Sequence, residues 1–141
     1  MSRRRRMQEH AMRIDRIDHL VLTVADVDTT IRWYEEVLGM KHERFGDGRS
    51  ALRFGQQRIN LHPSEGEIQP RATKPTEGSA DICLILDGSV EEAITHLNSL
   101  EVPLLLGPVM RTGATGPLTS LYVRDPDGNL IELSTYSESS R

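Results

Sequence analysis

The last apolar segment of the chain carries a carboxylate that could take part in chemistry. Leu130, Glu132 and Ser134 fall on one face of an alternating strand pattern, and Ile131 and Leu133 fall on the other. The aliphatic pair would anchor the strand to a core, so the opposite face presents Glu132. The same pattern also fits an ordinary half-buried strand with a solvated glutamate. Glu132 alone therefore does not identify a site.

Three further polar residues follow the same rule of lying opposite an aliphatic face. His19 and Asp81 each begin a strand-like segment, and His62 ends another on the face that also holds Asn60. Two imidazoles and two carboxylates suit a divalent transition metal such as Zn²⁺, Ni²⁺, Mn²⁺, Fe²⁺ or Co²⁺. Each residue alone also has a structural explanation, as a hydrogen-bonded histidine or a strand-end residue. The set of four predicts a metal site more strongly than any one member.

The first half of the chain reads as a strand, a helix and two more strands. The strand covers 17–24 and is rich in β-branched and aliphatic residues. Asp26 or Asp28 can cap the helix, which runs to about Leu38 and stops at Gly39. Short strands follow at 50–54 and 58–62, and 63–79 is predicted to be a linker.

The second half repeats this order of elements. A strand over 80–86 precedes a helix that opens with the capping-box pattern of Ser89 and Glu92 and runs to about Leu100. We then expect a strand at 103–106, a glycine-rich loop over 107–117, and a hairpin pairing 118–124 with 129–136.

The two halves align at an offset of 62 residues, which lays His19 on Asp81 and Leu38 on Leu100. Two copies of this length are too few for a repeat array, so we interpret the pattern as a duplication within one domain. Pairing of the halves about a pseudo-twofold axis would bring the four polar residues together.

Size and composition limit the functional class. A chain of 141 residues fits one compact domain with a real core. The formal net charge of −4 argues against a general nucleic-acid binder. No apolar run approaches the roughly 18 residues that cross a bilayer, so no membrane partner is expected. Cys83 is the only cysteine, which gives no sign of an oxidising compartment and favours the cytoplasm.

The ends of the chain are predicted to lie outside the domain. Residues 1–13 are polar, contain the run Arg3 to Arg6, and lack the apolar region of a secretory signal. We expect a disordered or artificially added tail there, with a patch for nucleic acid or a membrane surface as the alternative. Residues 137–141 form a second short tail, so the domain covers 14–136.

Three motifs resemble the vicinal oxygen chelate superfamily, which includes glyoxalase I, fosfomycin-resistance proteins, extradiol dioxygenases and bleomycin-resistance proteins. They are Ile17-Asp-His-Leu20, Tyr34-Glu-Glu-Val-Leu-Gly-Met40 and Asp125-Pro-Asp-Gly-Asn-Leu-Ile-Glu132. The chain is most similar to small glyoxalase-domain proteins of the domain-containing-5 type, in which the segments 60–62, 81–84 and 111–114 also fit.

This resemblance implies an α+β fold of two βαβββ modules, over about 14–64 and 80–136, that curl into a cup of mixed sheet around a metal. It also implies a homodimer and ligand places at His19, His62, Asp81 and Glu132. Two places depart from the family pattern. Glyoxalase I usually has glutamate or glutamine where this chain has His62, and glyoxalase I, extradiol dioxygenases and fosfomycin-resistance enzymes have histidine where this chain has Asp81. Those specific activities are therefore less well matched than the general metal site.

The leading hypothesis is a metal-dependent enzyme that acts on a small molecule. The cation would chelate two neighbouring substrate oxygens and stabilise an enolate-like charge, as in glyoxalase-type isomerase or lyase chemistry. Glu132 would be a ligand and a candidate base, and Asp81 the other candidate base. Substrate contacts are expected from guanidinium groups, exposed backbone amides and polar side chains in the same cup. The residues are Arg111, Thr112, Gly113, Tyr122, Arg124 and Asn60.

Other interpretations remain open at the level of sequence. The loop around Arg111 also fits a plain surface turn. The protein could be a metal-free binding or resistance protein of the bleomycin-resistance type, or an iron-dependent dioxygenase that consumes oxygen with a catechol. A purely structural metal is a further possibility. The sequence does not distinguish a site within one chain from a site shared by two chains.

Overall fold

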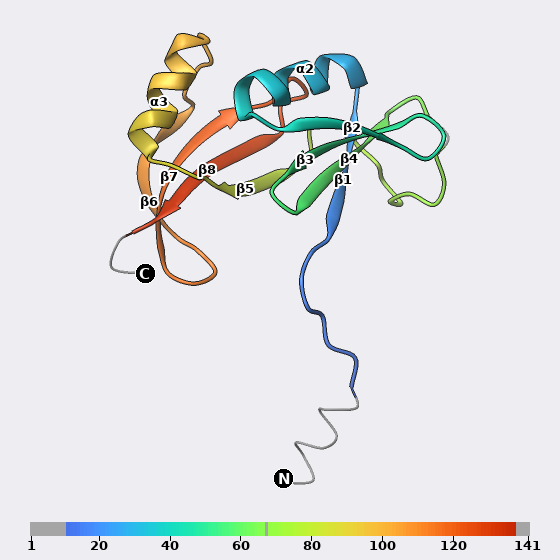
Figure 1. Ribbon diagram of the computed structural model, residues 1–141, viewed down its shortest axis with the longest axis horizontal. Helices are drawn as coiled ribbons and strands as arrows, with labels where there is room; N and C mark the ends of the chain where they lie inside the picture. The colour runs from blue at the N-terminus through green and yellow to red at the C-terminus, as the bar shows by residue number, and fades with distance from the viewer. Residues whose placement is uncertain (1–10, 67, 138–141) are drawn as a thin grey trace, which may run out of the picture.

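The computed structural model describes residues 11–66 and 68–137, which form two modules with the same order of elements (Figure 1). The N-terminal module has a four-stranded sheet in the order β1-β4-β3-β2, in which β1 and β4 run parallel and the other pairs antiparallel. Its elements are β1 (His19–Val24), α2 (Val27–Leu38), β2 (Lys41–Phe45), β3 (Arg49–Phe54) and β4 (Gln57–Pro63).

The C-terminal module repeats this topology with a second four-stranded sheet in the order β5-β8-β7-β6. Its elements are β5 (Asp81–Ile85), α3 (Val90–Ser99), β6 (Leu106–Thr112), β7 (Pro117–Arg124) and β8 (Leu130–Tyr136). Each module is therefore a βαβββ unit, and the predicted α+β fold is confirmed.

Both predicted helices begin and end where the sequence indicates. The Asp26 side chain accepts a hydrogen bond from the Thr29 N–H at 2.9 Å, and Gly39 ends α2 in the left-handed region with φ of 67°. Ser89 and Glu92 form the expected capping box at the start of α3. Local capping chemistry thus sets the helix boundaries.

Two edge strands differ from the sequence-based expectation. The predicted loop over 107–117 is wrong, because β6 occupies most of it and only the turn around Gly113 and Gly116 remains, closed by a 2.8 Å backbone hydrogen bond. The strand predicted at 103–106 is also wrong, because β6 begins only at Leu106. Strand β2 was missed. Both strands lie at sheet edges and contain no buried residue, so their sequences lack the strong apolar alternation that predicts a half-buried strand.

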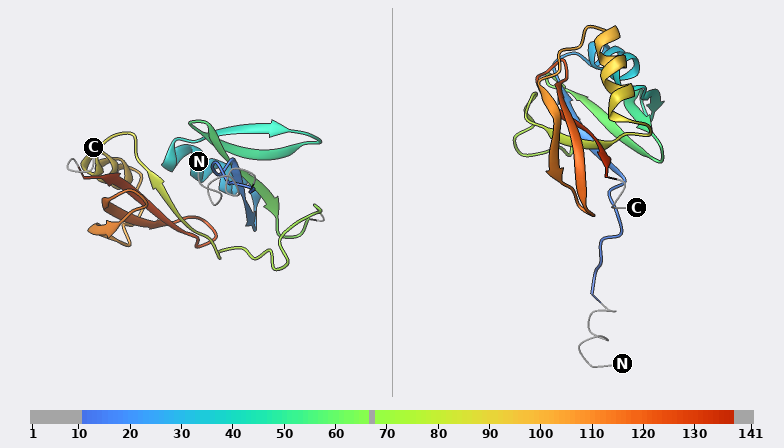
Figure 2. Two further views of the ribbon diagram at one scale, coloured as in Figure 1. Left: turned by 90° about the horizontal axis from the view of Figure 1, so that it is seen from below. Right: turned by 90° about the vertical axis from the view of Figure 1, so that its left-hand side faces the viewer.

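One face of each sheet packs against the helix of its own module, and these faces merge into a single core. Leu22 and Ile59 come from the N-terminal sheet and Leu121 and Ile131 from the C-terminal sheet, with Tyr34 of α2 in the same cluster. We call the opposite faces the N-terminal outer face, with His19, Asn60 and His62, and the C-terminal outer face, with Asp81 and Glu132. Figure 2 shows the two modules side by side, joined by the segment that leads into β5.

The modules contact one another through side chains and turns, and no described strand of one sheet is hydrogen-bonded to the other sheet. The Ala25 N–H donates to Asp127 Oδ1 at 3.1 Å, and His96 Nε2 lies 2.9 Å from the Val37 carbonyl oxygen. These contacts fasten the helix side of one module to the other.

The predicted tails lie mostly outside the described residues, which exclude 1–10 and 138–141. Within the described part of the chain, no helix is long and apolar enough to cross a membrane.

Candidate functional site

The strand register aligns the two outer faces position by position. Val21 of β1 lies beside Asn60 of β4, and Cys83 of β5 lies beside Glu132 of β8. His19 and Asp81 each start the edge strand of their sheet, two residues earlier. Asn60 is therefore the structural equivalent of Glu132, and His62, two residues further along, is the equivalent of Ser134.

Asn60 has an unsatisfied polar atom at this equivalent position. The residue is 4% exposed, and its Oδ1 accepts no hydrogen bond from any residue that the structure describes. An unpaired buried amide oxygen is costly and calls for a partner such as a ligand or an ion. Sequence reasoning placed Asn60 among the substrate contacts, because only the strand register reveals its equivalence to Glu132.

His62 lies among cations instead of carboxylates. It is 7% exposed, and its Nε2 lies 3.0 Å from Arg49 Nη2. Burial lowers the pKa of His62, and the charges of Arg49 and Arg71 lower it further. A small pocket lined by Thr23 and Arg71 adjoins the ring. The prediction that His62 is a metal ligand remains a prediction, and these surroundings favour a different role.

His19 is exposed and oriented by its sequence neighbour. Its Nδ1 lies 2.9 Å from Asp18 Oδ2, and this hydrogen bond is the main reason that the pKa of Asp18 is lowered. A carboxylate that accepts the Nδ1 proton leaves the Nε2 lone pair available, which is the usual arrangement for a metal-binding histidine.

The Glu132 carboxylate is held by two serines on the C-terminal outer face. Ser120 Oγ donates to Glu132 Oε2 at 2.6 Å and Ser134 Oγ approaches the same oxygen at 3.4 Å. Both serines are fully buried. Both hydroxyls contact Oε2. The other carboxylate oxygen, Oε1, accepts no hydrogen bond from the described residues and is free for a ligand.

Asp81 lies near Glu132 at the start of the neighbouring edge strand and is exposed. Cys83 follows it on the same face, with its Sγ 3.4 Å from Ser134 Oγ. Burial raises the pKa of the Cys83 thiol, and the charges of Glu132 and Asp81 also raise it. The two predicted carboxylates, Asp81 and Glu132, therefore lie close enough together to act on the same thiol.

The turn between β7 and β8 fixes this locality to the rest of the molecule. Asp125 accepts hydrogen bonds from Tyr34 Oη at 2.6 Å and from Asn129 Nδ2 at 2.8 Å. Asn129 Oδ1 in turn accepts the Ala80 N–H at 2.8 Å, which links the start of β5 to the start of β8. Burial raises the pKa of Tyr34, and the Asp125 charge raises it further. The phenol therefore stays protonated and donates to the carboxylate.

The predicted substrate residues of the C-terminal module lie in three places. Arg111 Nε donates to Tyr122 Oη at 3.0 Å, and Tyr122 lies directly beside Glu132 in the sheet. Arg124 instead donates to the Gly128 carbonyl at 3.3 Å in the closing turn. The remaining two residues, Thr112 and Gly113, end β6 and begin the following turn.

The structure does not bring the four predicted ligands together in one chain. Among the described residues, no group of three or more His, Cys, Asp or Glu side chains is placed to hold a metal ion. His19 and Asn60 lie on one outer face, and Asp81 and Glu132 lie on the other. The predicted ligands are thus divided between the two outer faces.

Comparison with known proteins identifies the family. The sequence profile described as the Glyoxalase/Bleomycin resistance protein/Dioxygenase superfamily matches residues 16–133. The chain belongs to this superfamily. Virulence protein STM3117 of Salmonella typhimurium is 54% identical over 125 residues, covering 89% of this chain and 87% of that protein. Its crystal structure has a TM-score of 0.88 and covers 89% of this chain and 100% of its own.

Two further members of the superfamily are informative. Glyoxalase domain-containing protein RDO1 of Mycosarcoma maydis is 47% identical over 131 residues, covering 93% of this chain and 74% of that protein. Lactoylglutathione lyase of Agrobacterium tumefaciens has a TM-score of 0.66 at 24% identity, covering 86% of this chain and 94% of its own, and at this identity it establishes the shared fold alone. The expected similarity to the domain-containing-5 type stays a prediction.

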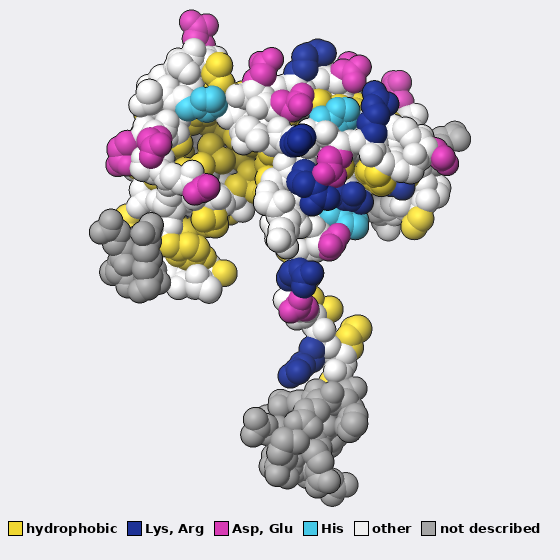
Figure 3. Space-filling view, in the orientation of Figure 1, with side chains coloured by type: hydrophobic (Ala, Val, Ile, Leu, Met, Phe, Trp, Pro, Cys, Tyr) yellow, Lys and Arg dark blue, Asp and Glu magenta, His cyan; other side chains and the backbone are white. Residues whose placement is uncertain are grey.

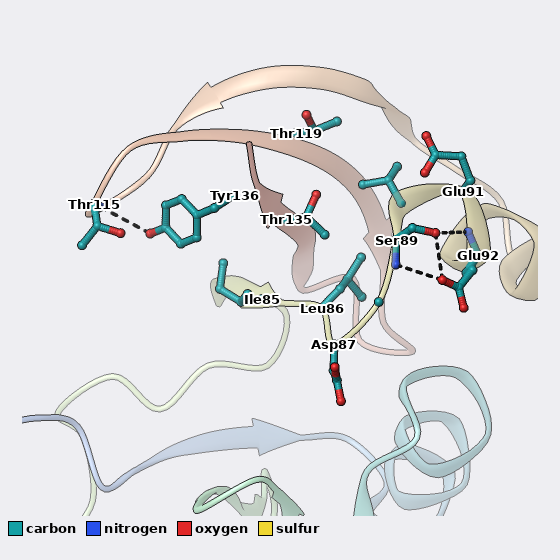
Figure 4. A pocket seen from close by; sticks show the side chains of 12 residues that line it. Ile85, Leu86, Asp87, Ser89, Glu91, Glu92, Thr115, Thr119, Thr135 and Tyr136 are labelled. Carbon is teal, nitrogen blue, oxygen red and sulfur yellow. Dashed lines mark hydrogen bonds between the residues drawn. The ribbon is translucent and has the colours of Figure 1, made fainter. Parts of the chain in front are cut away.

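Two larger cavities of this superfamily member are lined by residues other than the predicted site residues. One, of about 680 Å³, opens between the start of α3 and the end of β8, beside the Ser89–Glu92 capping box (Figure 4). The other, of about 1070 Å³, lies between the modules and is lined by residues such as Met40, Phe54 and Leu84. Neither contains a predicted metal or substrate residue, so the outer faces remain the candidate site.

Proposed function

We propose that the protein is a metal-dependent enzyme of glyoxalase type, which performs isomerase or lyase chemistry on a small molecule. Its site would form between the N-terminal outer face of one chain and the C-terminal outer face of a second copy. The observation that carries this proposal is the matched register of His19 with Asp81 and of Asn60 with Glu132, on two faces whose described His, Cys, Asp and Glu side chains form no metal-holding group within one chain.

The donor atoms fit a divalent transition metal. His19 offers Nε2, Asn60 offers its unpaired Oδ1, and Glu132 offers Oε1, while Asp81 supplies a second carboxylate. A mixture of imidazole, amide and carboxylate ligands suits a borderline cation such as Zn²⁺, Mn²⁺, Fe²⁺, Ni²⁺ or Co²⁺. Members of this superfamily often use divalent metals. In this proposal Asn60 takes the place that sequence analysis gave to His62.

A bound cation would polarise two neighbouring substrate oxygens and stabilise negative charge that develops on them. The protein's own groups would do the rest. Glu132 or Asp81 would accept and return the proton, and Ser120 would hold the Glu132 carboxylate in place. Arg111 and Tyr122, already hydrogen-bonded to each other beside Glu132, would orient the substrate.

The first test is metal content. Purified protein should be loaded with Mn²⁺, Fe²⁺, Zn²⁺ or Ni²⁺, desalted and analysed for metals. We expect about one ion per chain. His19→Ala and Glu132→Ala should each lose the metal, because each removes a residue that would coordinate it directly. The control Glu91→Ala removes an exposed carboxylate from α3 and should keep the metal.

Absence of stoichiometric metal in the unaltered protein under all four conditions would overturn the enzyme proposal. The bleomycin-resistance type of metal-free binding protein would then be the better explanation. If metal binds, turnover of a hemithioacetal should be assayed next, and lack of metal-dependent turnover would remove the glyoxalase-like reaction. Oxygen consumption with a catechol would instead support a dioxygenase.

A further inference from the structure

The N-terminal outer face carries an excess of cations. Figure 3 shows lysine and arginine side chains gathered over the module that contains β2, β3 and β4. Alternation of β2, β3 and β4 places four cations on this face against one carboxylate, Glu43, and these cations are Lys41, Arg49, Arg53 and Arg58. Asp18, just before β1, adds a second carboxylate whose charge acts on Arg53 and Arg58. An unbalanced group of cations on a protein surface attracts anions.

Two of these arginines form no ion pair with a described carboxylate. Arg53 is ion-paired with Glu43, but neither Arg49 nor Arg58 has a carboxylate within ion-pairing distance among the described residues. The Nε atom of Arg49 is buried and has no hydrogen-bond partner. A buried guanidinium nitrogen without an acceptor is costly, so its surroundings favour an added anion.

Aromatic stacking holds the two guanidinium groups in place. Arg49 Cζ lies 5.1 Å and Arg58 Cζ lies 4.4 Å from the centre of the Phe45 ring. Arg49 Nη2 is also hydrogen-bonded to His62. Because these contacts restrict the side chains before any ligand arrives, less entropy would be lost on binding.

The arginine pair lies next to the proposed metal ligands. Ala51 pairs with Asn60, and Arg49 is two residues before Ala51 on the same face, about 7 Å along the strand. The unpaired Asn60 Oδ1 and the unpaired Arg49 Nε are therefore neighbours on one surface. A small ligand could engage both.

We propose that Arg49 and Arg58 bind a carboxylate or phosphate group of the substrate, so that the substrate is a small oxyanion. This inference rests on the proposed function, because the neighbouring oxygens of the same molecule would be held at Asn60 and the other metal ligands. The anionic group would lie a few bonds from the reacting centre. Charge-assisted hydrogen bonds from a fork-shaped guanidinium would give it a fixed orientation.

The test uses metal-free full-length protein and two probes, inorganic phosphate and acetate, at an ionic strength held constant with chloride. The measurement is the shift of arginine Nε–H resonances by NMR. We expect saturable binding of at least one probe with a shift of the Arg49 resonance. Arg49→Met should weaken that binding at least tenfold and Arg58→Met several-fold. Arg44→Met, which removes an exposed arginine from the other side of β2, should change it less than twofold.

Binding that is absent, or equally weak in all three variants, would overturn the inference. The preference between the probes identifies the anionic group as phosphate or carboxylate. Sedimentation of the same variants tests the rival role: dissociation of a dimer by Arg49→Met, without anion binding by the unaltered protein, would assign the arginines to the subunit interface.

Metal content separates this inference from the function on which it rests. Arg49→Met should keep the metal content of the unaltered protein, because Arg49 is not a ligand. Anion binding by a protein that takes up no metal would overturn the proposed enzyme and leave the anion subsite standing. Metal uptake without anion binding would overturn the anion subsite and leave the proposed enzyme standing.

Discussion

The two modules share one topology and one strand register, yet their outer faces present different chemistry. The N-terminal face offers two imidazoles, an amide and several guanidinium groups, whereas the C-terminal face offers two carboxylates, of which Glu132 is supported by serine hydroxyls. The duplicated backbone fixes where the donors lie, and the residue types divide the donors between the halves. Neither face alone carries the full ligand set of the proposed function, so that proposal requires unlike halves to come together.

The turns that end the two modules also differ. The turn between β7 and β8 is tied to α2 through Tyr34 and Asp125 and to the start of α2 through Asp127. The corresponding turn between β3 and β4, around Gly55 and Gln56, instead lines the open cavity between the modules. Only the C-terminal turn fastens one module to the other, so mutations in the two turns should have unequal effects.

The largest effect is expected from Asp125→Ala, because Asp125 accepts hydrogen bonds from Tyr34, from Asn129 and from the Asp127 N–H. Leaving these buried donors unpaired should lower the free energy of unfolding by about 3–5 kcal/mol. Gln56→Ala in the other turn is exposed and should change it by less than about 0.5 kcal/mol. Urea denaturation measures both, and equal losses would erase the contrast between the turns.

The next effect concerns the pairing of unlike faces between two chains. Val21 is 43% exposed on the N-terminal outer face and Ile85 is 54% exposed on the C-terminal one. Val21→Asp or Ile85→Asp would bury an unpaired carboxylate and weaken dimerisation at least about 100-fold, or roughly 2.7 kcal/mol. Analytical ultracentrifugation measures this. Leu100→Asp, at the end of α3 and away from both faces, should leave association unchanged, and an equal loss there would contradict the proposed interface.

A smaller effect distinguishes Asn60 from His62 as the metal ligand that β4 would supply. Asn60→Ala should weaken metal affinity about tenfold, equivalent to about 1.4 kcal/mol, because it removes a neutral oxygen ligand. His62→Ala should change the affinity less than about threefold, since His62 faces Arg49. Titration against a competing chelator measures both affinities. A greater loss in His62→Ala would favour the ligand set inferred from the sequence.

The smallest effect is a pH-dependent change at Asp127. Burial raises the pKa of this carboxyl, so the folded state binds its proton more readily than the unfolded state. Its charge therefore opposes folding, and this penalty grows as pH rises from the ordinary to the raised pKa. Asp127→Asn keeps the oxygen that accepts from Ala25 and should stabilise the protein by up to about 0.5 kcal/mol at pH 7.

The gain from Asp127→Asn should vanish at pH values below the ordinary pKa of an aspartate, where Asp127 is protonated in both states. Thermal unfolding of the metal-free protein at several pH values measures the difference. A loss of stability at pH 7 would show that the charge of Asp127 supports the turn.

Much of the fold could be predicted from the sequence because its signals are local. Asp26, Gly39 and the Ser89–Glu92 box set helix boundaries through contacts within a few residues. The edge strands β2 and β6 escaped prediction because their pairing comes from neighbouring strands and not from their own hydrophobic pattern. At Gly107, for example, an added Cβ would meet the Ser120 carbonyl oxygen at 2.5 Å, a constraint imposed by the partner strand.

The candidate site was predictable only in part for a related reason. Alternation identified the outer faces and with them His19, Asp81 and Glu132. It could not select between Asn60 and His62, because both lie on the same face and only the pairing of Val21 with Asn60 distinguishes them. Nor could it reveal that Arg49 Nε is buried without a partner, which depends on long side chains that cross the sheet.

The division of donors between outer faces has a genetic consequence. If His19 of one chain serves the same site as Glu132 of its partner, then a dimer of His19→Ala with Glu132→Ala contains one doubly altered site and one intact site. Two inactive proteins would thus restore each other when their subunits are exchanged, to about a quarter of the original number of sites after random mixing. Such complementation requires that sites be shared, since a site built within one chain would stay defective in every mixture.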